Sequence, residues 1–191
     1  MAFSRREIIM AKYSNVTAGQ TEACINRMGG WENFLRFIGG QGRIVFETIL
    51  TIIRTVVVFS KPAVTTSKEY FKEAGVRWMG KNFETQFLGL EVEATEEVEL
   101  AVRKLEQASL DAPILAELGG KAELTVSQFQ TFLAANRGSS EWFVFYLKGK
   151  DGNLWAVDAL WSADDVGWSV NANSVGSPRR WDADRQVVSR N

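Results

Sequence analysis

The chain has 191 residues, of which 46% are hydrophobic and 24% charged, and its formal net charge is −1. This composition is typical of a globular protein and excludes both a disordered chain and a dedicated, strongly basic nucleic-acid binder. Histidine is absent and Cys24 is the single cysteine, which excludes Ser-His-Asp and Cys-His catalysis and zinc sites built from His and Cys.

Cellular location is predicted from three features of the sequence. A single cysteine cannot form an internal disulfide, which is typical of a reducing compartment. The apolar residues 8–10 are too few for the core of a signal peptide. The most apolar stretch, residues 44–59, contains Glu47 and Arg54 and is shorter than the roughly 20 apolar residues of a membrane helix. We therefore expect a cytoplasmic protein that does not span a membrane.

The first predicted elements are two short helices followed by β-structure. Thr17 and Gln20 have the spacing of a capping box, which predicts a helix that ends at the following glycine pair. Residues 31–38 carry apolar side chains at helical spacing and predict a second helix. Residues 44–59 are rich in Ile, Val and Thr and predict β-structure with a bend near Glu47 or Arg54.

Four further helices are expected in the middle of the chain. Capping-box spacing at residues 66–69 and 125–128 predicts two of them, and residues 81–88 predict a third. The fourth is expected from residue 95, because Val98, Val102 and Leu105 recur at helical spacing after several glutamates.

The last fifty residues contain five of the seven tryptophans, set at strand spacing. Residues 142–147 and 154–161 flank an Asp-Gly pair, which is typical of a hairpin turn. Further strands are expected at 168–175 and 186–189. The predicted fold is α+β, with short helices in the first two-thirds and an antiparallel, Trp-rich β-meander at the C-terminus. Residues 1–90 and 91–191 are expected to form two domains or one continuous domain.

Several segments support a resemblance to a known family. They are residues 25–30, 34–37 and 65–80, then 167–170, 173–175, Trp181 and 188–191. In these segments the chain resembles uncharacterised proteins encoded by uncultivated bacteria. The resemblance implies no activity and no site residues. It also implies a complete bacterial protein whose C-terminus is Asn191.

Strand alternation at 168–175 predicts one solvated face that carries Ser169, Asn171 and Asn173. The two preceding strands are apolar on both faces, which favours packing of their tryptophans over a sugar-binding surface. Asp158 is the exception within them. Because an unpaired buried carboxylate is costly, we expect Asp158 to pair with an arginine, either Arg179 or Arg180.

Three candidate sites follow from these residues. A binding surface is predicted on the solvated strand face, at Asn171 and Asn173. A basic loop at residues 179–190 is predicted to hold a polyanion, through Arg179, Arg180, Trp181 and Arg185. A divalent-cation site is predicted from three carboxylates, those of Asp158, Asp164 and Asp165.

The sequence leaves three classes of function as alternatives. Because catalytic residue types are missing, the sequence favours a non-enzymatic binding or protein-interaction module without a cofactor. The alternatives are a nucleic-acid or polyanion binder that uses the basic loop and a carboxylate- and metal-dependent hydrolase. The abundance of aromatic residues also predicts a subunit of a homo- or hetero-oligomer, with another protein as its partner.

Overall fold

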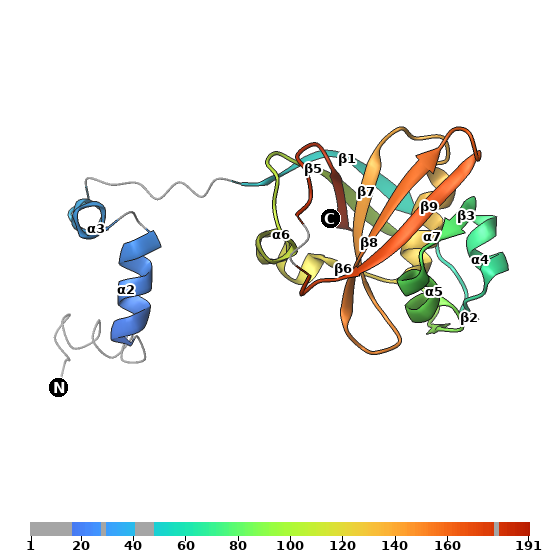
Figure 1. Cartoon of the computed structure of the whole chain (residues 1–191), viewed down its shortest axis with the longest axis horizontal. Helices are drawn as coiled ribbons and strands as arrows, with labels where there is room; N and C mark the ends of the chain where they lie inside the picture. Colours follow the sequence, from blue (N-terminus) through green and yellow to red (C-terminus); the bar gives the residue numbers. More distant parts are fainter. Residues whose placement is uncertain (1–16, 28–29, 41–47, 178–179) are drawn as a thin grey trace. The chain divides into compact units, whose positions relative to one another are not determined.

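The computed structural model describes residues 17–27, 30–40, 48–177 and 180–191 (Figure 1). The chain divides into two compact units, residues 1–47 and 48–191. Six α-helices and a largely antiparallel 8-stranded sheet lie within the described residues. The predicted α+β fold class is therefore confirmed. None of the described helices combines the length and the apolarity needed to cross a bilayer.

The first unit contains helices α2 (Ala18–Arg27) and α3 (Trp31–Ile38). The predicted capping box is present, because the Thr17 N–H donates to Gln20 Oε1 at 2.8 Å and the Gln20 N–H donates to Thr17 Oγ1 at 3.3 Å. None of the side chains described in residues 17–27 and 30–40 is buried. This pair of helices therefore has no closed core of its own.

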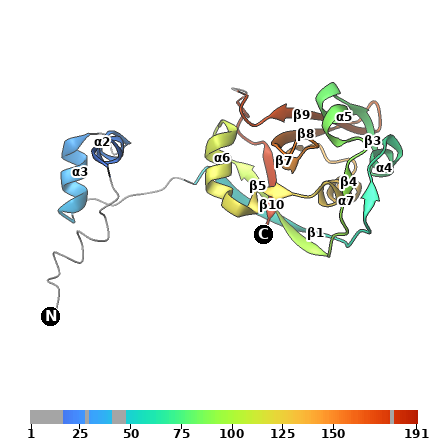
Figure 2. The ribbon, with the colours of Figure 1, turned by 90° about the horizontal axis from the view of Figure 1, so that it is seen from below.

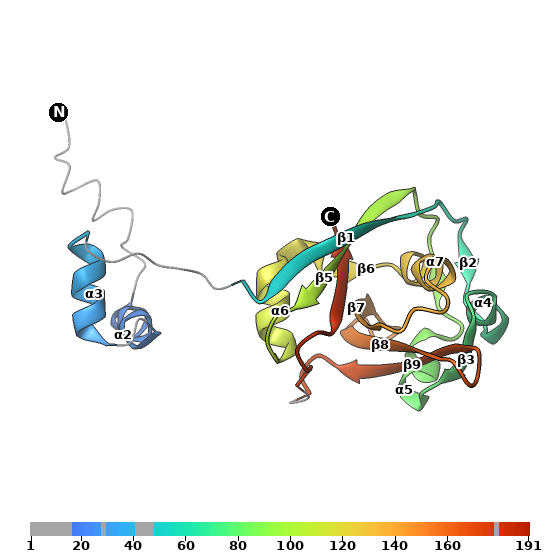
Figure 3. The ribbon, with the colours of Figure 1, turned by 90° about the horizontal axis from the view of Figure 1, so that it is seen from above.

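The second unit is built around the sheet, whose strand order is β1-β5-β10-β7-β8-β9-β3, with β6 paired to β7 beside this path. Three pairs are parallel, namely β10 with β7, β6 with β7 and β3 with β9. In Figure 3, β1 and β9 lie on opposite borders of the unit and α7 lies between them. The strands of the sheet are β1 (Leu50–Val58), β3 (Val76–Met79), β5 (Val98–Leu105), β6 (Glu123–Leu124), β7 (Trp142–Lys148), β8 (Leu154–Ser162), β9 (Gly167–Ser174) and β10 (Gln186–Arg190).

Four α-helices and a small two-stranded sheet complete this unit. The small sheet pairs β2 (Val64–Thr65) with β4 (Glu91–Val92). Figure 2 shows α6 well separated from α7 in the unit. The helices are α4 (Lys68–Glu73), α5 (Lys81–Phe87), α6 (Asp111–Leu118), which continues into the 3-10 helix η1 (Gly119–Lys121), and α7 (Val126–Ala135).

The expected hairpin and its third strand are present. β7, β8 and β9 pair in antiparallel order, and Gly152 has the positive φ, +77°, that the turn requires. β10, by contrast, does not extend these three strands. It lies between β5 and β7, antiparallel to one and parallel to the other.

The helix expected from residue 95 is wrong, because this segment is the interior strand β5. Val98, Leu100 and Val102 also alternate with Glu99 and Ala101, so the same residues fit a period of two. β5 pairs with β1 on one side and with β10 on the other. These pairings join residues far apart in the sequence, and they override the local helical pattern.

Several local features of the second unit differ from the prediction or refine it. β3 and α6 were not predicted. The capping box expected at residues 66–69 is wrong by one residue, because Ser67 caps α4 by accepting a hydrogen bond from the Tyr70 N–H, whereas Thr66 Oγ1 donates to the Phe87 carbonyl. The register of β1 shifts between Ile52 and Arg54, close to the bend expected at Arg54. The alternative bend at Glu47 lies outside the described residues. The sheet receives strands from both sides of residue 90, and the proposed boundary there stays a prediction.

Each face of the sheet packs on its own hydrophobic core. The first core lies under α4, α5 and α7, where Phe129 meets Phe145 edge-on with ring centroids 4.9 Å apart. The second core lies under α6 and includes Val144, Tyr146 and Trp181. β7 supplies alternate residues to both cores, which matches the expectation that this strand is covered on both sides.

Candidate functional site

The residues of the predicted solvated strand face lie on the side of the sheet opposite α7, on β8, β9 and β3. Asn171 lies directly opposite Asp158, and Ser169 lies between Leu160 and Trp78 of the neighbouring strands. Trp78, on the last strand of the sheet, is 52% exposed. The sequence gives no local signal for Trp78, because β3 is short and its pairing with β9 joins distant segments. This surface is called the polar face and comprises Trp78, Trp142, Asp158, Leu160, Ser169, Asn171 and Asn173.

Asp158 is buried, with 3% exposure, at the centre of this face. Its Oδ2 accepts a hydrogen bond from Trp142 Nε1 and its Oδ1 accepts one from Asn173 Nδ2, both at 3.2 Å. The guanidinium of Arg185 lies over the Trp142 ring, 3.5 Å from its centroid. The Trp142 indole N–H and the Asn173 amide are therefore both hydrogen-bonded to the Asp158 carboxylate, and Arg185 covers one face of the Trp142 indole.

The residues predicted as a basic loop have separate partners. Arg180 is exposed and donates to the Ala108 carbonyl at 2.9 Å. Trp181 is buried, so its ring is not accessible to a nucleic-acid base. Arg185 pairs with Asp182 at 3.0 Å. Arg179, which was also expected to pair with Asp158, lies outside the described residues.

The three aspartates of the predicted metal site are not brought together. Asp158 lies in the middle of β8, whereas Asp164 and Asp165 lie in the turn that follows this strand. Asp165 Oδ2 accepts a hydrogen bond from Ser162 Oγ at 2.8 Å. Within the described part of the chain, no three Asp, Glu or Cys side chains are placed to hold a metal ion.

A second buried carboxylate, Asp111, was not predicted. It is the first residue of α6, and its Oδ1 accepts hydrogen bonds from Tyr146 Oη at 2.8 Å and from Trp181 Nε1 at 2.7 Å. Burial raises the pKa of the Tyr146 hydroxyl, and the negative charge of Asp111 raises it further. Pro113 in the first turn and Gly119 after the last are the sequence signals that could have identified α6.

The buried carboxylates of Asp111 and Asp158 both hold neighbouring elements together through hydrogen bonds. Asp111 connects α6 to β7 and to the segment containing Trp181, and Asp158 connects β8 to β7 and β9. Each accepts an indole N–H and one further donor. This arrangement stabilises the fold and positions side chains, because buried carboxylates require several donors.

A different kind of surface lies along β1, at the opposite end of the sheet from Trp78. Among the described strands β1 pairs only with β5, so its other edge is free. Four large apolar side chains on and just after β1 are exposed, and this set is called the apolar edge: Ile52 (48%), Ile53 (45%), Val57 (46%) and Phe59 (66%). The Ile, Val and Thr content of this segment predicts β-structure but not its position at an edge.

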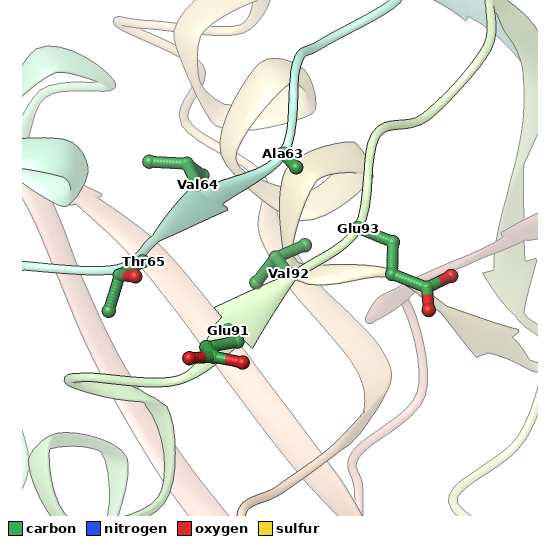
Figure 4. Close-up of a pocket in the computed structure, with 6 residues that line it drawn as sticks. All are labelled: Ala63, Val64, Thr65, Glu91, Val92 and Glu93. Atoms are coloured by element: carbon green, nitrogen blue, oxygen red, sulfur yellow. The ribbon is translucent and has the colours of Figure 1, made fainter.

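A shallow hollow of about 490 Å³ lies beside the small β2–β4 sheet (Figure 4). Its lining contains two carboxylates and no basic side chain. The lining residues are Ala63, Val64, Thr65, Glu91, Val92 and Glu93.

Comparisons with protein-family models, with curated proteins and with solved structures each found no match. The resemblance to uncharacterised proteins of uncultivated bacteria stays a prediction. We therefore infer a function for the chain from its fold class and its described surfaces.

Proposed function

We propose that this chain is a non-enzymatic protein-interaction module that binds an extended segment of a partner along β1. The observation that carries this proposal is the apolar edge on a strand with one free side. Of the eleven large hydrophobic side chains exposed in the described residues, four belong to this edge. Exposed apolar groups that gather in one place are typical of interaction surfaces.

The backbone of β1 supports the same function. An edge strand presents unpaired N–H and C=O groups, and natural proteins usually protect such edges with charged side chains. Arg54 is the one charged residue of β1, and its guanidinium is engaged by Asn136 and Glu141, both at 3.1 Å. An extended segment can therefore add to β1 through backbone hydrogen bonds, and the apolar edge can contribute side-chain contacts.

The remaining surfaces favour this function over its alternatives. In the proposed module the Trp-rich C-terminal meander is a scaffold, because Trp168 and Trp181 are buried and Trp142 is engaged by Asp158 and Arg185. Nucleic-acid binding through the basic loop is less well supported, since Trp181 cannot stack on a base. A cytoplasmic location is part of the proposal, motivated by the single cysteine, and cell fractionation tests it.

The test is selection of binders from a library of random extended peptides, followed by affinity measurement with the Val57→Lys variant. We expect selected peptides to bind this variant at least about tenfold more weakly, because a lysine removes apolar contact and adds a charge at the edge. Val166→Lys is the matched control, since Val166 is exposed in the turn after β8. Equal affinity of the wild type and Val57→Lys, or no enriched peptide, would contradict the proposal.

A further inference from the structure

Helix α3 presents a continuous apolar stripe to solvent. Trp31, Phe34, Leu35 and Ile38 recur at the i, i+3, i+4 and i+7 positions that share one helix face. Trp31, Leu35 and Ile38 are 58%, 45% and 60% exposed. The Trp31 and Phe34 rings lie 5.3 Å apart between centroids, so the aromatic part of the stripe is already assembled.

The first unit does not cover this stripe with its own described residues. The described side chains of α2 are exposed except for that of Ile25, which is half-buried. An isolated helix of eight residues is marginal in water, so α3 needs packing of its apolar face for stability. Chains of about 40 residues without a disulfide or metal commonly obtain such packing by oligomerisation.

We infer that a second copy of this chain covers the stripe, with the two α3 helices packed antiparallel. The stripe is symmetric about its midpoint, between Phe34 and Leu35. An antiparallel pair therefore places Trp31 of one copy opposite Ile38 of the other, and Phe34 opposite Leu35. Each large ring then meets an aliphatic side chain, as close packing between helices requires.

The charges of α3 leave the stripe free for a second copy. At about 100° per residue, Arg36 lies nearly opposite the stripe, and Glu32 pairs with it on the polar side of the same helix, with Arg36 Nη2 lying 3.4 Å from Glu32 Oε1. Neither charge is therefore buried where two stripes meet. A helix that lies on a membrane surface usually has a strongly basic polar face, which one Arg and one Glu do not provide.

This inference concerns the first unit and does not depend on the proposed function of β1. Sedimentation equilibrium of the full chain tests it, and the expected species has twice the 21.4-kDa mass. Leu35→Glu is expected to weaken the dimer at least about tenfold. Leu110→Glu, a matched control because Leu110 is 44% exposed in the other unit, is expected to leave the dimer unchanged.

A size-exchange pair tests which residues meet between copies. Trp31→Ile sets two isoleucines opposite each other and Ile38→Trp sets two tryptophans opposite each other, so each variant alone is expected to dimerise about tenfold more weakly. An equimolar mixture of the two variants is expected to form a heterodimer with the wild-type affinity, because each tryptophan then again meets an isoleucine. Variants that do not recover on mixing would overturn the antiparallel pair.

Two results with the wild-type chain would overturn the inference as a whole. One is a monomer at all concentrations studied. The other is a monomer that co-sediments with anionic phospholipid vesicles, which would assign the stripe to a membrane surface.

Discussion

The two faces of the sheet are covered in different ways, although alternate residues of the same strands contribute to both. Under α7 the contacts are almost entirely aromatic and aliphatic, as between Phe129 and Phe145. Under α6 and across the polar face, the buried groups include the carboxylates of Asp111 and Asp158, each of which accepts an indole N–H. The first face stabilises the fold through burial of apolar area. The second adds to its own hydrophobic core hydrogen bonds that fix the positions of loops and α6.

The largest effect is expected on the aromatic face. Phe129 is fully buried, and its ring centroid lies 6.4, 5.9 and 4.9 Å from those of Phe71, Phe83 and Phe145. Phe129→Ala is expected to lower the free energy of unfolding by about 3–5 kcal/mol, because it removes these contacts and leaves a cavity. Urea denaturation measures this loss.

Phe59→Ala is the matched control for this substitution. Phe59 is 66% exposed, and its replacement is expected to change the free energy of unfolding by less than about 0.5 kcal/mol. Similar losses for the two variants would show that the face under α7 is not the main source of stability.

A smaller effect is expected from the buried carboxylate under α6. Asp111→Ala leaves Tyr146 Oη and Trp181 Nε1 without their acceptor. The free energy of unfolding is expected to fall by about 2–4 kcal/mol, the cost of two unsatisfied buried donors. Asp164→Ala, at an exposed turn position, is expected to have little effect in the same denaturation experiment. A loss below about 0.5 kcal/mol for Asp111→Ala would remove the distinction between the two faces.

The smallest effect concerns alkaline pH. The folded-state pKa of Tyr146 is raised above its ordinary value of 10.0 by burial and by Asp111. The unfolded chain therefore loses this proton first as the pH rises, and the free energy of unfolding falls above pH 10. Between pH 10 and 11 this tyrosine accounts for a loss of about 1 kcal/mol.

Burial also raises the pKa of Tyr70, which packs under α7, so the wild type should lose stability through both tyrosines. Tyr146→Phe should remove only its own share, and chemical denaturation at pH 10 and pH 11 measures the difference. An identical pH dependence in the wild type and this variant would contradict the assignment.

The features predicted correctly depend on residues close together in the sequence. The caps at Thr17 and Thr125 use side chains and backbone groups three residues apart, and both are present. The hairpin turn at Gly152 depends on a single glycine that tolerates positive φ. Each of these features involves residues that are only a few positions apart. Its sequence pattern can therefore be recognised without knowledge of the tertiary structure.

The candidate sites were predicted less completely, because their geometry depends on distant segments. Asn171 and Asn173 were placed correctly on one strand face, yet their neighbour Trp78 comes from β3, about ninety residues earlier in the sequence. Asp111 was not predicted, since no residue near it in the sequence indicates that Tyr146 and Trp181 donate to it. Asp158 was recognised as anomalous, but its donors Trp142 and Asn173 were not identified.

The sequence by itself determined the α+β composition, the helix caps at Thr17 and Thr125, the C-terminal hairpin and the alternation that buries Trp168 while leaving Asn171 half-buried. Only the tertiary structure decided that residues 98–105 form a strand, that β10 lies between β5 and β7, and that β1 pairs with β5 alone among the described strands. The physical reason is that strand pairing joins segments far apart in the chain. A strand gains its hydrogen bonds and its burial from those partners, whereas a helix or a tight turn satisfies most of its backbone locally.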